Sequence, residues 1–299
     1  MHTKIVAVLV FLTCLPGISQ AAINVFACEP EWAALARALS DGEIKIYSAT
    51  TSTQDPHHIQ ARPSLIAKAR RADLLICTGA ELEAGWLPLL LRKAGNAKIQ
   101  PGQPGYFMAA DYVDMLEVPT TLDRSLGDIH ASGNPHIHLE PNNIARIANA
   151  LTQRLIELDE NNSVRYQKNK KQFIKRWQQA MADLSERAAS LRGQKIVMHH
   201  NSWPYLNHWL GMSAVATLEP IPGVPPASSH LARLKNRLSH DDVAMIIHAA
   251  YINERSAQWL SAKTGIPVVS LPASVDFHQG ETLVQFYGAL IDALMAAGE

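Results

Sequence analysis

The sequence carries no excess of charge of either sign, because its 299 residues include 27 lysines and arginines and 27 aspartates and glutamates. Proteins that bind nucleic acid or an anionic membrane surface need a basic patch. The even balance therefore argues against both as partners. After the N-terminal stretch, the chain also has no apolar run approaching the roughly 20 residues that a membrane-spanning helix needs.

The N-terminal stretch, residues 1–22, is the main hydrophobic exception. It begins with Lys4 and an apolar run from Ile5 to Leu12, and it ends with the small residues Ser19 and Ala21. That pattern predicts a cleaved secretory signal peptide, so the mature protein is expected in the periplasm. A membrane anchor is the alternative, but the apolar run is short for one, and the residues before Cys14 fit a lipid-attachment site poorly.

Cysteine is scarce, with three in the whole chain. Cys14 would leave with the signal peptide, so Cys28 and Cys77 remain, an even number in an oxidising compartment. Each closes an apolar run, INVFAC (23–28) and DLLIC (73–77). We predict a disulfide between two neighbouring strand ends, with two buried thiols as the alternative.

Short β-rich runs alternate with helical patterns in two blocks, which predicts an α/β fold with parallel sheets flanked by helices. No glycine-serine linker separates the two blocks. The sequence also has no internal repeats. We predict an N-terminal α/β lobe over 23–141, a connecting helical segment over 142–192 and a C-terminal α/β lobe over 193–299. The two lobes would be joined by one long backbone helix, because an apolar stripe runs at helical spacing through Phe173, Trp177, Met181, Leu184, Ala188 and Leu191.

Histidines occur in pairs in three of the loops between these elements. In parallel sheets ligands bind in the loops at the carboxyl ends of strands. Three imidazoles and one oxygen donor make a tetrahedral site for zinc. Nearby acids, Asp55, Asp128 and Glu140, are candidates to orient the rings. The pairs are His57 with His58, His136 with His138, and His199 with His200. The other histidines after the signal peptide are interpreted as surface or hydrogen-bonded residues; they are His130, His208, His230, His240, His248 and His278.

The loops DPHHIQARPS (55–64), NPHIHLEP (134–141) and HHNSWPYL (199–206) together resemble the metal boxes of one protein family. These are the substrate-binding proteins of bacterial zinc and manganese ABC importers, and the resemblance spans the mature chain. It implies that His57, His136 and His200 are the metal ligands. Their partners His58, His138 and His199 would then pack against neighbouring residues or hold the ligands in place.

The fourth ligand is where the chain departs from that family. The family usually supplies an aspartate after the last strand, where this chain reads LPASVDFHQ (271–279). Asp276 is our choice, with Glu219, His278 and water as alternatives. The chain also lacks the histidine-rich acidic insertion of many zinc-specific members. Three histidines still favour zinc over manganese, which prefers oxygen ligands.

The resemblance implies a monomeric periplasmic receptor, not an enzyme, that binds zinc as its transported ligand and delivers it to the membrane permease of an ABC importer. Two alternatives are a secreted zinc-dependent hydrolase and a metal-chelate binding protein of the same fold. A hydrolase needs a general base beside a zinc-bound water, and no HExxH sequence supplies one. Because protons compete with metal for imidazole, three histidine ligands predict an acid-side affinity slope above two per pH unit.

Overall fold

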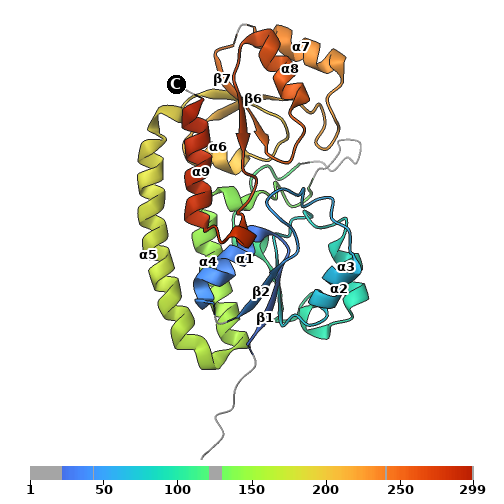
Figure 1. Ribbon diagram of the computed structural model, residues 1–299, viewed down its shortest axis with the longest axis vertical. Helices are drawn as coiled ribbons and strands as arrows, with labels where there is room; N and C mark the ends of the chain where they lie inside the picture. Colours follow the sequence, from blue (N-terminus) through green and yellow to red (C-terminus); the bar gives the residue numbers. More distant parts are fainter. Residues whose placement is uncertain (1–21, 43, 121–129, 240, 298–299) are drawn as a thin grey trace, which may run out of the picture.

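A computed structural model describes residues 22–42, 44–120, 130–239 and 241–297 (Figure 1). Two four-stranded parallel sheets form the molecule, in the orders β2-β1-β3-β4 and β6-β5-β7-β8. This confirms the predicted α/β fold with two sheets. The strands are β1 (Asn24–Ala27), β2 (Lys45–Ser48), β3 (Leu74–Cys77), β4 (Tyr106–Met108), β5 (Lys195–Met198), β6 (Ser213–Thr217), β7 (Val243–Ala249) and β8 (Val268–Leu271).

Proline sets the start of many of the helices that flank these sheets. Its fixed φ and missing N–H suit the first turn, where the backbone N–H has no helical partner. Five described helices carry one there: α1 (Pro30–Ser40), α2 (Pro63–Ala69), α3 (Leu87–Ala94), α4 (Pro141–Leu158) and α6 (Pro204–Leu210). The helices α7 (Ser228–Leu238), α8 (Arg255–Thr264) and α9 (Leu283–Ala296) complete the second half.

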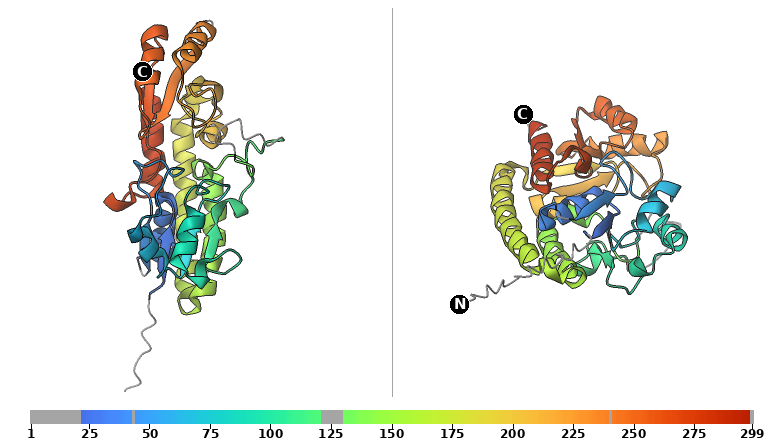
Figure 2. Two further views of the ribbon diagram at one scale, coloured as in Figure 1. Left: turned by 90° about the vertical axis from the view of Figure 1, so that its right-hand side faces the viewer. Right: turned by 60° about the horizontal axis from the view of Figure 1, so that its bottom comes forward.

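The long helix α5 (Ser163–Arg187) runs along one side of both halves, and α9 lies beside it (Figures 1 and 2). The six residues of the predicted apolar stripe are all buried, but the last two, Ala188 and Leu191, follow the end of α5 at Arg187. Trp177 donates its indole N–H to the Pro141 carbonyl at the start of α4, at 2.9 Å, and packs edge-on against Tyr287 of α9. The stripe therefore fixes α5 to elements from both ends of the chain, which confirms the long connecting helix.

Both faces of the first sheet are covered, as expected for parallel strands. Along β1, Val25 and Ala27 enter a core that extends through α5 and α9 into the second sheet, whereas Phe26 and Cys28 enter a separate core under α2 and α3. One continuous apolar core thus joins the two sheets. The exact lobe boundaries at 141/142 and 192/193 stay a prediction.

The predicted disulfide between Cys28 and Cys77 is present, with a Cα–Cα distance of 4.8 Å. The two cysteines meet because β1 and β3 are adjacent parallel strands. The bond closes a segment with a sequence separation of 49. In the chain-entropy description, such a loop stabilises the fold by about 4 kcal/mol.

Two further expectations concern the membrane and the N-terminus. No helix in the described ranges is both long and apolar enough to span a bilayer. The predicted signal peptide, 1–22, falls almost entirely before the first described residue, and Cys14 lies outside the described residues.

Two carboxyl groups are buried together beside the disulfide. Glu29, which precedes α1, and Glu83 both accept hydrogen bonds from the backbone N–H of Thr78, at 3.1 and 2.7 Å. Burial, then the neighbouring Glu83 and Glu31, raises the pKa of Glu29 well above its usual value, and burial raises the pKa of Glu83 to about 7. The pair therefore holds a proton that free glutamates would have lost.

We expect this pair to make the metal-free protein less stable as pH rises. The folded-state pKa values lie above those of the unfolded chain, so the contribution is complete below about pH 4.5 and is lost towards pH 7 and above, at up to ~1.4 kcal/mol per pH unit for each proton. Glu29→Gln, whose amide can donate to Glu83 without titrating, should flatten the slope. Urea unfolding at several pH values would measure it. Glu186→Gln, an exposed change on α5, is the control, and equal slopes in both variants would contradict the prediction.

Candidate metal centre

Three predicted ligands come from loops that begin or end at elements of both sheets. His57 lies in the loop between β2 and α2, and His200 follows the end of β5 by two residues. His136 precedes the short 3-10 turn η4 (Ile137–Leu139) that leads into α4. The carboxyl ends of β2 and β5 therefore face a common space, which is where parallel sheets place ligands.

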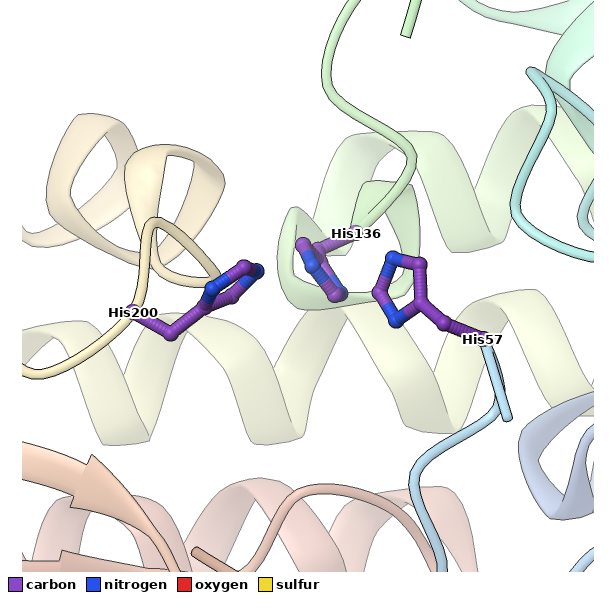
Figure 3. Close-up of side chains that lie close together, drawn as sticks. All are labelled: His57, His136 and His200. Carbon is purple, nitrogen blue, oxygen red and sulfur yellow. The ribbon is translucent and has the colours of Figure 1, made fainter. Parts of the chain in front are cut away.

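The side chains of His57, His136 and His200 converge in that space (Figure 3). Their ring centroids are 5.8 Å apart for His57 and His136, 6.0 Å for His57 and His200, and 6.0 Å for His136 and His200. One ring nitrogen from each lies within 4.8 Å of the other two. Three imidazoles spaced evenly around one point are a suitable donor set for a metal ion of the zinc type.

The His57 ring is oriented by a carboxylate on its own loop. Its Nδ1 donates to Asp55 Oδ1 at 2.8 Å, and its backbone N–H donates to the same oxygen at 3.0 Å. Burial alone raises the pKa of Asp55, but these hydrogen bonds outweigh it and hold that pKa below its usual value. With Nδ1 carrying the proton, Nε2 keeps its lone pair for a metal, as the sequence analysis anticipated for Asp55.

A carboxylate also orients the His200 ring. It belongs to Glu219, which the sequence analysis gave as an alternative for the fourth ligand. Glu219 Oε2 accepts from His200 Nδ1 at 2.7 Å and from the backbone N–H of Gly223 at 2.8 Å. Glu219, one of the alternatives for the fourth ligand, therefore supports His200 in this structure. Glu140 is bonded to none of the three ligands' rings, because it accepts from His208 instead, at 2.9 Å. Asp128 lies outside the described residues.

His136 is the most enclosed of the three, with 5 % of its surface exposed. Burial, followed by the neighbouring His57, His200, His138 and His130, lowers its pKa well below the usual value. It is therefore neutral at ordinary pH, and neutral imidazole is the form that binds metal. Its backbone N–H is bonded to Asn134 Oδ1, which fixes the loop just before the ring.

The partner of each ligand points elsewhere. His58 is 71 % exposed at its side chain. His138 is buried between Glu31, at 3.4 Å, and the Ala273 carbonyl, at 3.0 Å. His199 is buried with Nε2 4.0 Å from Glu219. His138 and His199 are thus packed in the interior, whereas His58 is exposed and packs against little.

Asp276 is not among the residues whose ligand atoms cluster with the three histidines. It begins the 3-10 turn η7 (Phe277–Gln279), where its carboxylate accepts from the backbone N–H of Gln279. Arg37 of α1 binds the Phe277 carbonyl and holds this turn against α1. A helix-capping aspartate uses its oxygens locally, so the position that follows β8 in this chain does not deliver an acid to the histidines. His278, on the same turn, is also exposed and outside the cluster.

His130 was interpreted from the sequence as one of the scattered histidines, and the structure places it beside His57. The two rings have centroids 5.3 Å apart, and their Nε2 atoms are 3.3 Å apart. The residue belongs to none of the three quoted boxes, which is why a motif search passes over it. Its position six residues before His136 on one loop was the available signal.

A solvent-connected cavity of about 400 Å³ opens beside the cluster. Its lining includes three of the histidines, and Glu117 on its wall accepts hydrogen bonds from the side-chain amides of Asn134 and Asn201. Hydrated ions can reach the histidines through a polar opening of this kind. The histidines on its wall are His130, His136 and His200.

Comparison with known families gives a match over nearly all of the described chain. The family model described as "ZnuA: Zinc-uptake complex component A periplasmic" matches residues 25–297. The match therefore includes both sheets, α5 and all three clustered histidines.

Individual relatives are distant but extend along most of the chain. A manganese ABC transporter substrate-binding lipoprotein, PsaA of Streptococcus mitis, is 22% identical over 268 residues, 88% of this chain and 84% of its own. An iron ABC transporter substrate-binding lipoprotein, MtsA of Streptococcus pyogenes serotype M1, is 21% identical over 253 residues, 83% of this chain and 78% of its own.

Solved structures show the same fold. The crystal structure of ZnuA superposes with a TM-score of 0.78 at 19% identity, covering 93% of this chain and 100% of that one. The manganese-bound periplasmic metal binding protein from candidatus Liberibacter asiaticus gives 0.74 at 16% identity, covering 93% and 100%.

Proposed function

Because this chain belongs to the family of the periplasmic component A of the zinc-uptake complex, we propose that it is a periplasmic receptor that captures zinc and delivers it to the permease of an ABC importer. Its ligands are His57, His136 and His200. Its signal peptide directs export of residues 23–299. The exported protein acts as a monomer and passes zinc to the membrane permease. Zinc is its cargo and not a resident cofactor.

The observation that carries this proposal is the convergence of three imidazoles from three separate loops on one point. Two of them have Nδ1 bonded to a carboxylate, Asp55 or Glu219, so that Nε2 is left to bind metal. A histidine held by an outer carboxylate is the usual arrangement at zinc sites, because the carboxylate fixes the tautomer and makes the ring a better donor.

The choice of zinc over manganese or iron rests on ligand type. The relatives PsaA and MtsA are named for manganese and iron. Manganese prefers carboxylate and carbonyl oxygens, whereas imidazole suits zinc. In this chain the carboxylates of Asp55 and Glu219 bond to the histidines, and Asp276 caps a turn. The nitrogen-rich set therefore favours zinc.

A secreted zinc hydrolase is the rival function, since three histidines also leave an open position for water. Such an enzyme needs a general base aimed at that water. The acids bonded to His57 and His200 are engaged in orienting those rings, which favours a binding role over turnover.

Metal analysis combined with a hydrolase screen tests the proposal. Metal-free protein, dialysed against zinc and then freed of excess, should hold one zinc per chain and should not hydrolyse ester, peptide or phosphoester substrates. Competition against manganese should leave zinc bound. Turnover that depends on bound zinc would support the hydrolase, and manganese displacing zinc at equal concentration would overturn the choice of metal.

A further inference from the structure

We propose that His130 is a fourth metal ligand, so that the site offers four imidazoles and discriminates strongly for zinc against cations that prefer oxygen. This inference rests on the proposed function and completes the same site. It replaces the aspartate that the family supplies after its last strand and that this chain does not bring to the histidines.

The distance between the two facing nitrogens carries the argument. His57 Nε2 and His130 Nε2 are 3.3 Å apart. Zinc binds imidazole nitrogen at 2.0–2.1 Å with tetrahedral angles, which puts neighbouring nitrogens about 3.3 Å apart. The two Nε2 atoms stand at the separation that a shared zinc ion requires. His130 lies outside the group of ligand atoms that His57, His136 and His200 form within 4.8 Å of one another, so its ring must move closer to His136 and His200 when zinc binds.

The tautomer of His57 leaves its Nε2 able to bind a metal ion at this contact. Its Nδ1 donates to Asp55, so Nε2 presents a lone pair towards His130. Without metal, a hydrogen bond from His130 Nε2 to this lone pair explains the contact equally well. With metal, both Nε2 atoms can bind the same ion, and only an experiment that counts ligands separates the two roles.

The backbone that carries His130 is held in place by several contacts. Its carbonyl accepts from the Gly133 N–H at 3.1 Å, and Ser132 donates through its hydroxyl and its backbone N–H to the Glu81 carboxylate, at 2.9 and 3.2 Å. Gly133 adopts φ +107°, and a Cβ there would lie 2.7 Å from the Leu116 carbonyl oxygen. The loop from His130 to His136 thus has a defined shape that brings the His130 ring against His57 and the His136 ring into the cluster.

His130 also lies on the wall of the cavity that leads to the cluster, together with His136 and His200. An ion that enters through this cavity therefore reaches His130 before all the other ligands have bound it. His58 lies next to His57 in the chain but is exposed, so it offers a matched histidine without this placement.

The experiment counts imidazoles on zinc and measures affinity in four proteins: wild type, His130→Ala, His130→Gln and His58→Ala. X-ray absorption at the zinc edge should show four imidazoles in wild type and His58→Ala and three in His130→Ala. Competition titration should show zinc affinity at least ~10-fold weaker in both His130 variants, since even an outer partner of a ligand contributes 10- to 100-fold. Manganese affinity should change less, so the ratio of zinc affinity to manganese affinity should be smaller in the His130 variants than in wild type.

The glutamine variant separates ligation from hydrogen bonding, because its amide can still donate to His57 Nε2 but is a poor zinc ligand. Wild-type affinity in His130→Gln, or three imidazoles on zinc in the wild type, would overturn this inference and leave the proposed function standing. A wild-type protein that fails to retain zinc at all would overturn the proposed function itself.

Discussion

Replacing His136 with alanine should weaken zinc binding more than ~100-fold, beyond the 10- to 100-fold that loss of an outer partner causes. His136 is the most enclosed of the clustered rings and is held neutral by burial, so it binds without first losing a proton. His57→Ala and His200→Ala should cause losses of similar size, because each removes one bond to the metal. Competition titration with a metal indicator at pH 7.5 measures all three.

The controls are the second histidines of the same pairs. His58→Ala removes an exposed ring, whereas His138→Ala and His199→Ala remove buried rings that contact Glu31 and Glu219. All three should keep zinc affinity within about 10-fold of wild type, with circular dichroism confirming that the buried variants fold. Equal losses in all six variants would overturn the assignment of a single ligand within each pair.

Zinc affinity should fall steeply in acid, and the slope should report how many ligands must lose a proton. An ordinary imidazole has a pKa near 6.5, so metal competes with few protons at pH 7.5 and with more at pH 5. Burial lowers the pKa of His136, so His136 stays neutral as the pH falls and adds nothing until its lowered pKa is reached. His136 therefore contributes less to the slope than an imidazole with an ordinary pKa would.

The slope of log affinity against pH near pH 5 then separates the possible ligand sets. Each imidazole that must lose a proton adds up to one to the slope, so three histidines give a limit of three, and the lowered pKa of His136 reduces its share. A fourth imidazole from His130 would raise that limit to four. A carboxylate-dominated site would give a slope near zero, because carboxylates with pKa near 4 are already ionised. Titrations between pH 5 and 7.5, corrected for protonation of the indicator, would distinguish these outcomes, and a slope of one or less would contradict the histidine site.

The sequence by itself determined the architecture and the main binding loops. Alternating apolar runs and amphipathic stretches specify parallel strands and covering helices, because burial on both faces of a strand and on one stripe of a helix leaves a local periodicity. The stripe from Phe173 to Leu191 predicted α5 for that reason. The disulfide also followed, since Cys28 and Cys77 each end a strand-like run in an exported chain.

Only the tertiary structure decided which polar groups meet, because hydrogen bonds between loops leave no periodic signal in the chain. Glu219 orients His200 across 19 residues, and His130 reaches His57 across 73. Asp276 was chosen from its place after the last strand, but local capping of η7 uses its carboxylate. Side-chain direction at a loop depends on the packing of the whole fold. The histidine boxes and Asp55 could therefore be found from the sequence, whereas the contacts of Glu219 with His200 and of His130 with His57 could not.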